Sequence, residues 1–279
     1  MKNILILTDF SNNSWNSIEY TLALFQNKRC NFYLLNAKKR NHEVMDELVY
    51  DNLLVAKKKN QKEKFDELLV KISKSTLKGE HIFTSILAGK DIIESARHQI
   101  EEKKIDLVVI GTNGMSSDGR KNNISPTSED IITKLKCSIL VVPNEAQFSM
   151  LKEIAFPTDY TNFYEAKLLQ NISSLLSFHE SPINFVHVTK KAEILNREQK
   201  WNKETLEDYF ANQPHSFHSQ VNPNFEQSIE DFIDEKGIDL IVMAAKNLNL
   251  FEQILFRPKL KSIKYYFKTP FLVLHQFNY

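Results

Sequence analysis

The chain has 279 residues, of which 42% are hydrophobic and 25% are charged, as is typical of a globular protein. Its 36 basic and 35 acidic side chains leave a net charge of +1, so no bulk field attracts nucleic acid or an anionic membrane, and we expect neither as a partner. No stretch approaches the roughly 18 apolar residues of a membrane helix, and the apolar run at the start is too short for a signal peptide.

Short apolar runs alternate with stretches of helical spacing throughout the first half. The predicted strands are 4–7, 32–35, 82–87, 107–110 and 139–142. The predicted helices are 12–26, 42–75, 91–104 and 128–135, the first of them capped by Ser11 or Asn12. This alternation predicts a parallel sheet with right-handed crossovers. The lysine-rich run 57–64 is expected to be a solvated helix face.

The second half of the chain repeats the first. Residues Lys2–Asn12 read KNILILTDFSN and residues Lys152–Asn162 read KEIAFPTDYTN, while Ile105–Gly111, IDLVVIG, returns at Ile238–Ala244 as IDLIVMA. The repeat spans about 140 residues, roughly one domain length. We therefore predict two tandem α/β domains, 1–146 and 147–279, joined by a short polar segment.

Strands of the second copy are predicted at 154–156, 183–188, 217–221, 240–243 and 271–274. The segment 271–274 fits an edge strand available for pairing, and a core strand would read the same way. The two cysteines, Cys30 and Cys137, lie at strand edges without a CxxC motif. They are predicted to be core thiols of a cytoplasmic protein.

Parallel sheets of this kind bind ligands beyond the carboxyl ends of their strands. We therefore expect the residues that follow the strands of the first copy to line one crevice. They are Thr8, Asp9, Ala37, Gly89, Gly111, Asn113, Gly114, Ser125, Thr127 and Ser128.

The loop after the fourth strand has the chemistry of an anion site. Gly111 and Gly114 let backbone N–H groups approach an anion closely. Ser125, Thr127 and Ser128 would bring hydroxyls to a helix N-terminus, where phosphate is favoured. Asp9 could hold ribose hydroxyls or a metal ion that bridges phosphates. A G-x-x-G stretch is more often only a turn, so both interpretations stay open.

These motifs resemble the universal stress protein family in its tandem two-domain form. The resemblance rests on the duplicated ILxxTD(F/Y) start, on the IDL(V/I)V strand followed by GTNG, and on the closing CSILVVP. It implies two tandem open five-stranded parallel sheets, each an α/β/α sandwich of the adenine-nucleotide-binding type, that form an intrachain pseudo-dimer. Many members of the family bind ATP through a loop of the form G-x2-G-x9-G-(S/T).

By that resemblance Gly111 and Gly114 are the two leading glycines of the loop, and the third is missing. Ser125 stands in its place and Pro126 at the usual phosphate-contacting position, where it has no N–H to donate. Asp9 matches the acidic residue after strand one, and Ala37 matches the position whose backbone faces adenine.

The second copy keeps Asp159 but has Ala244 and Asn247 where the first has its two glycines. The region 251–259 contains no glycine and no hydroxyl cluster. We therefore expect a degenerate structural partner whose apolar residues at 248–256 cover the crevice or a domain interface.

Two leading functions remain from the sequence, beside a third, a small-molecule enzyme of unknown type. The first is a stress-response regulator that binds an adenine nucleotide, ATP with or without Mg²⁺, in the first copy, acts on a protein partner that the sequence does not identify, and can form a homodimer. The alternative is an interaction scaffold that binds no nucleotide. Neither is a dedicated enzyme, because no P-loop, nucleophile elbow, general base or metal cluster stands out; weak ATP hydrolysis stays open.

Overall fold

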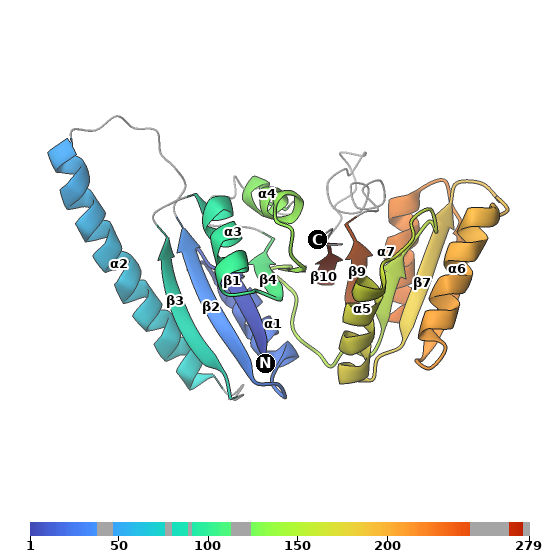
Figure 1. Cartoon of the computed structure of the whole chain (residues 1–279), viewed down its shortest axis with the longest axis horizontal. Coiled ribbons are helices and arrows are strands. Elements are labelled where there is room, and N and C mark those ends of the chain that lie inside the picture. The colour runs from blue at the N-terminus through green and yellow to red at the C-terminus, as the bar shows by residue number, and fades with distance from the viewer. Residues whose placement is uncertain (38–46, 76–79, 89–90, 113–123, 246–267, 276–279) are drawn as a thin grey trace.

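The structure is a computed structural model that describes residues 1–37, 47–75, 80–88, 91–112, 124–245 and 268–275. Within these residues, strands and helices alternate along the chain (Figure 1). The strands are β1 (Lys2–Leu7), β2 (Cys30–Ala37), β3 (Ile82–Ala88), β4 (Leu107–Gly111), β5 (Ile139–Val142), β6 (Ile154–Pro157), β7 (Ile183–Thr189), β8 (His215–Val221), β9 (Leu240–Ala244) and β10 (Phe271–Leu274).

The described strands form one ten-stranded sheet in the order β3-β2-β1-β4-β5-β10-β9-β6-β7-β8. Read outward from the centre, the two halves have the same order, so β1 corresponds to β6 and β4 to β9. All pairs are parallel except β5 with β10, whose antiparallel register places Leu272 opposite Leu140. The predicted fold class is confirmed, and the fifth strands make the pseudo-dimer contact. The strand β10 is thus a pairing strand and a core strand at once.

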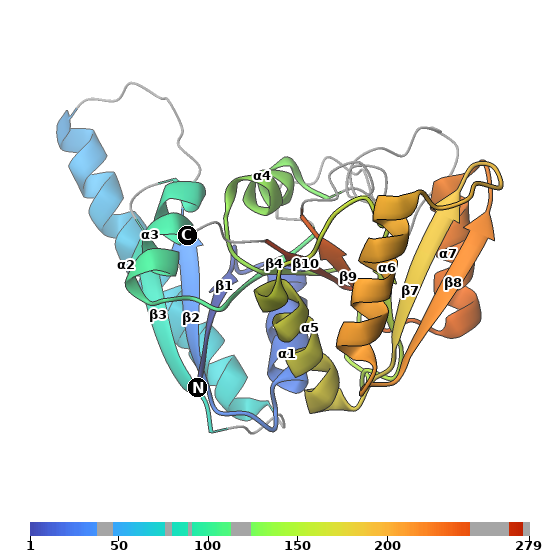
Figure 2. The same cartoon turned by 45° about the vertical axis from the view of Figure 1, so that its right-hand side comes forward.

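Helices cover both faces of the sheet. They are α1 (Asn12–Leu24), α2 (Glu47–Lys74), α3 (Ile92–Glu102), α4 (Pro126–Lys134), α5 (Ala166–His179), α6 (Arg197–Phe210) and α7 (Phe225–Lys236). One core cluster joins α1, α2, α5 and α6 to one face, and a second joins α3, α4 and α7 to the other. Figure 2 shows α1 and α5 at the centre, where the halves meet, with α2 and α6 farther out on either side.

An aromatic pair marks the same place in each half. Phe32 of β2 stacks on Phe83 of β3 with ring centroids 5.3 Å apart. Phe185 of β7 stacks on Phe217 of β8 at 4.8 Å. Both pairs have an interplanar angle of 16° and join the second and third strands of their half. The duplication seen in the sequence therefore extends to side-chain packing, where cross-strand aromatic pairs stabilise a sheet.

Several predicted bounds differ by a few residues from the structure. The helix α4 begins at Pro126 rather than at residue 128, because Ser125 caps it and proline suits the first helical position, where no N–H partner is needed. The part of the predicted helix 42–75 before residue 47 lies outside the described residues. Both cysteines are free and buried, as predicted. In the described part of the chain, no helix is long and apolar enough to cross a membrane.

Candidate functional site

The exit of β1 is a tight turn that leads into α1. The N–H of Thr8 donates to the carbonyl of Leu35 on β2 at 2.9 Å, which extends the sheet pairing by one residue. The Thr8 hydroxyl accepts from the N–H of Phe10 at 3.0 Å, and a carboxylate oxygen of Asp9 accepts from the N–H of Ser11 at 3.0 Å. Phe10 takes a φ of 64°, in the left-handed region. Local hydrogen bonds therefore stabilise the turn by which the chain leaves β1 and enters α1.

The side chain of Asn13, at the start of α1, lies directly over Gly111 at the end of β4. A Cβ atom on Gly111 would fall 2.8 Å from Asn13 Nδ2 and 2.9 Å from its Cγ. Asn13 is buried, with 6% of its surface exposed. The need for glycine at position 111 thus has a structural cause that the sequence does not show. The first residues of α1 approach the backbone of β4.

The N-terminus of α4 meets the same glycine from the other side. The N–H of Ser128 donates to the Ser125 hydroxyl at 3.1 Å, which is a helix N-cap. The Ser128 hydroxyl donates to the carbonyl of Gly111 at 3.0 Å, and the N–H of Ser125 donates to the carbonyl of Thr112 at 2.7 Å. The two serines are therefore near Gly111, as predicted, and their hydroxyls are also part of the local structure.

The end of β2 lies beside this turn. Asn36 donates from Nδ2 to the carbonyl of Thr8 at 2.7 Å, and its Oδ1 accepts from Gln61 of α2 at 2.6 Å. Ala37, the last residue of β2, follows Asn36 and lies at the same edge as Asp9. The amide of Asn36 thus fixes the edge at which Ala37 presents its backbone.

The structure places seven of the ten predicted site residues. Thr8 and Asp9 follow β1, Ala37 ends β2, and Gly111 ends β4 at the neighbouring position of the sheet. Ser125, Thr127 and Ser128 form the cap and first turn of α4. The predicted residues Gly89, Asn113 and Gly114 lie outside the described residues. Asn13 and Asn36 are not predictable from the sequence, since nothing in the spacing of a single asparagine identifies it as a residue that bridges strand ends.

The corresponding exit of β6 has the same turn. The Thr158 hydroxyl accepts from the N–H of Tyr160 at 3.0 Å, and Asp159 accepts from the N–H of Thr161 at 3.0 Å. Tyr160 has a φ of 58°, close to that of Phe10. The two turns therefore share their conformation and these two hydrogen bonds from backbone N–H groups.

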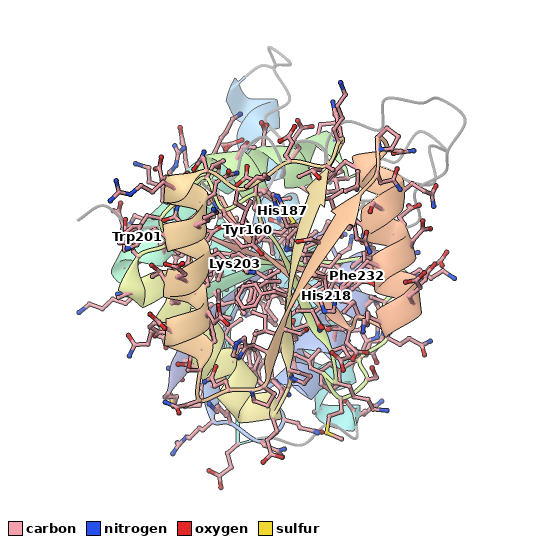
Figure 3. All side chains as sticks on the ribbon, turned by 90° about the vertical axis from the view of Figure 1, so that its right-hand side faces the viewer. Tyr160, His187, Trp201, Lys203, His218 and Phe232 are labelled. Atoms are coloured by element: carbon pink, nitrogen blue, oxygen red, sulfur yellow. The ribbon has the colours of Figure 1, made fainter. Side chains whose placement is uncertain are left out.

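A tyrosine is buried beside the exit of β6 in the second half. The ring of Tyr160 is 1% exposed and lies 5.0 Å from the ring of His187, whose Nδ1 is 3.0 Å from the carbonyl oxygen of Thr158 (Figure 3). From α6, Asn202 donates to the carbonyl of Tyr160 at 2.8 Å and Gln199 to that of Asp159 at 2.9 Å. Burial raises the pKa of Tyr160 well above its usual value. The residues 248–256, expected to cover the crevice or a domain interface, lie outside the described residues.

Comparisons with known proteins agree with this geometry. The model of the universal stress protein family matches residues 1–143. A universal stress protein from Archaeoglobus fulgidus DSM 4304 has 14% identity and a TM-score of 0.70, covering 98% of both chains. A Pseudomonas aeruginosa UCBPP-PA14 protein assigned to the same family has 12% identity and a TM-score of 0.57, covering 99% of this chain and 93% of its own. At these identities the solved structures show a common fold. The comparison with curated proteins finds no match. Since the family model covers more than half of the sequence, the chain belongs to the universal stress protein family.

Proposed function

We propose that the first half binds an adenine nucleotide in the crevice beyond β1, β2 and β4, and that this binding serves a regulatory role in the stress response. One observation carries the proposal: the N-termini of α1 and α4, capped by Ser11 and Ser125, both reach Gly111. Helix N-termini carry a partial positive charge and unpaired N–H groups, which favour a phosphate. Two of them at one strand end make a stronger anion site than either alone.

The donors around the crevice fit the parts of a nucleotide. Asp9 would take the ribose hydroxyls or a Mg²⁺ ion on the phosphates, and the backbone of Ala37 would face the adenine edge. Thr127 and the two serines of α4 would meet the phosphates. Gly89, Asn113 and Gly114 belong to the same proposal on sequence grounds. Asn13, which lies over Gly111, adds an amide to this set.

Equilibrium binding of a fluorescent ATP analogue, with and without Mg²⁺, tests the proposal. We expect the wild-type protein to bind and Asp9→Ala to lose most of that binding. The matched control is Asp159→Ala, because Asp159 caps an equivalent turn with an equivalent hydrogen bond. Both variants lose the bond to the backbone N–H two residues on, and Asp159→Ala also loses the bond from the Thr161 hydroxyl, so a loss of ATP binding confined to Asp9→Ala would not be explained by the turn. Equal binding by both variants would contradict the site.

A second candidate, the interaction scaffold without nucleotide, is favoured by the first turn of α4. Pro126 occupies its first position and has no N–H, and the Ser125 and Ser128 hydroxyls are joined at 2.9 Å. A phosphate there would find fewer donors than at an ordinary helix start. Absence of nucleotide binding by the wild-type protein would select the scaffold over the regulator.

The oligomeric state and the cellular location are further parts of the proposal. The pseudo-dimer joins β5 to β10, so a further homodimer would have to use another surface. Its existence, the protein partner and a cytoplasmic location stay predictions. Sedimentation or light scattering at several concentrations measures the first of these.

A further inference from the structure

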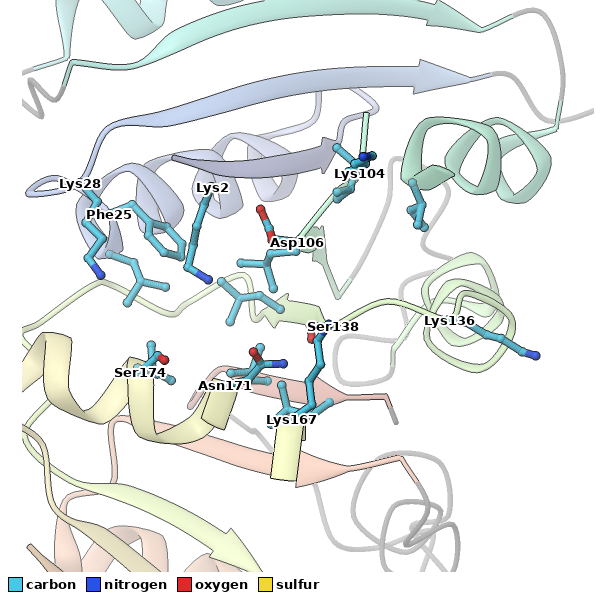
Figure 4. Close-up of a pocket in the computed structure, with 18 of the residues that line it drawn as sticks. Lys2, Phe25, Lys28, Lys104, Asp106, Lys136, Ser138, Lys167, Asn171 and Ser174 are labelled. Carbon is cyan, nitrogen blue, oxygen red and sulfur yellow. The ribbon is translucent and has the colours of Figure 1, made fainter. Parts of the chain in front are cut away.

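A large cavity lies between the two halves, at the opposite end of the strands from the crevice (Figure 4). Its volume is about 980 Å³, within the range of small-molecule sites. Lys2 begins β1 and Asp106 precedes β4, whereas Asp9 and Gly111 follow the same two strands. The cavity is therefore separate from the proposed nucleotide site.

The floor of the cavity is made of leucines from both halves. Leu107 and Leu140 come from β4 and β5, and Leu240, Leu272 and Leu274 come from β9 and β10. All of them are buried except Leu272, which is partly buried. Since the antiparallel β5–β10 pair runs across this floor, neither half forms the site alone.

The rim carries a concentrated positive charge. Among the described residues that line the cavity are six lysines and one arginine, against Glu101 and Asp106. The whole chain is almost neutral, with 36 basic and 35 acidic side chains, so this excess is local. Asp106 is also engaged by the N–H of Asn3, which donates to it at 2.7 Å.

Two of the cations are held by contacts with α4. Lys134 pairs with Asp130 at 2.6 Å, and Arg97 donates to the carbonyl of Lys134 at 3.1 Å. Lys2 and Lys167 belong to different halves, and Figure 4 shows them extending into the space between the halves from opposite sides. A bound anion would therefore draw both halves together across the seam.

We infer that this cavity binds an organic anion with an apolar body, such as a medium-chain carboxylate. The leucine floor takes apolar surface out of water, while the exposed lysines at the rim attract the charged head without having to be buried. On α5, the polar side chains of Asn171 and Ser174 line the wall together with Leu175 and Lys167. Because residues of both halves form the floor and the rim, the class of ligand depends on how the two halves pack together.

Calorimetric titration with decanoate tests the inference. Decyltrimethylammonium, with the same chain and the opposite charge, tests the head group, and inorganic phosphate tests the anion without the chain. We expect decanoate to bind with one site per chain and the cationic amphiphile to bind at least about tenfold more weakly, because two or more lysines act at the rim. Phosphate at the same concentration should not compete.

The variant Lys2→Glu/Lys104→Glu reverses two exposed rim charges and should weaken decanoate about tenfold. Its control, Lys190→Glu/Lys191→Glu, makes the same change of net charge at exposed lysines outside the lining. A second variant, Ser174→Trp, fills the cavity from an exposed position of α5 without changing any charge, and should also lose decanoate binding.

Several outcomes overturn the inference. They are equal binding of both amphiphiles, competition by phosphate alone, displacement of decanoate by ATP, or equal affinities for the rim variant and its control. Decanoate binding should persist in Asp9→Ala, in which the nucleotide is expected to be lost. The nucleotide site and the cavity can therefore fail independently.

Discussion

The exits of β1 and β6 share one backbone turn and differ in the side chain that covers it. In the first half, Phe10 lies partly exposed with its ring 5.0 Å from that of Phe65. In the second, Tyr160 is buried against His187. Asp9 and Asp159 each accept a hydrogen bond from the N–H two residues on, so the fold uses the acidic residue in either copy. A retained aspartate is therefore weak support for a ligand.

The largest effect should come from removing the two aromatic rings. Tyr160→Ala should lower the free energy of unfolding by about 3–5 kcal/mol, because it leaves a cavity in a packed interior. Phe10→Ala should cost only about 1–2 kcal/mol, since its ring is partly solvated already. Urea denaturation of both variants measures the difference. Equal losses of stability would mean that the two rings are packed to the same extent.

A smaller effect is expected at the ends of β4 and β9. Gly111→Ala should cost about 1–3 kcal/mol, because the new methyl group meets the side chain of Asn13. The reverse change, Ala244→Gly, should cost only about 0.5–1 kcal/mol through backbone entropy. Chemical denaturation measures both, and Gly111→Ala combined with Asn13→Ala should cost less than the sum of the two. Strict additivity would show that the close approach is not the cause.

Low pH should destabilise the contact between the two halves. Burial, helped by nearby Lys28, lowers the pKa of His179 from 6.5 to about 4. The unfolded chain therefore binds this proton first, and stability is lost as the pH falls from about 6.5 toward 4. Because the ring is partly solvated, we expect protonation of His179 to lower the free energy of unfolding by about 1 kcal/mol between pH 7 and pH 5.

Denaturation of the wild-type protein and of His179→Gln at both pH values tests this effect. The variant should lose part of the pH dependence and keep the part due to His81, His218 and His275, which are partly buried and whose pKa values are also lowered by desolvation. An unchanged slope in His179→Gln would contradict the assignment.

The smallest effect concerns the first turn of α4. Pro126→Ser restores an N–H group at the helix N-terminus and should tighten the fluorescent ATP analogue about two- to fivefold. The helix should still form, because Ser125 remains its cap. If affinity is unchanged while Asp9→Ala still abolishes binding, the nucleotide phosphates do not meet α4.

Much of the fold was predictable because buried strands leave a plain signal. The apolar run 4–7 and the repeated IDLVV-type run predict buried strands, and β1, β4 and β9 lie there. The strand β8 was expected to begin at residue 217 but begins at His215, because this strand is only partly buried and its polar residues hide the pattern. The ends of a predicted strand depend on which residues are buried, and the sequence indicates burial only indirectly.

The candidate site was predictable in part for a topological reason. Parallel strands bring their carboxyl ends to one edge, so Asp9, Ala37 and Gly111 were expected near one another, and the described structure places them there. The contact of Asn13 with Gly111 was not predictable, because it depends on the angle at which α1 leaves the turn.

The sequence by itself determined that the chain is a duplicated α/β unit, since periodic burial and a repeated phrase are properties of residue order. Only the tertiary structure decided that Tyr160 is buried beside the exit of β6, that β5 pairs with β10, and that leucines and lysines from both halves surround one cavity. The physical reason is that these features arise from packing between segments far apart in the chain, and packing depends on shape and position, which residue order does not state.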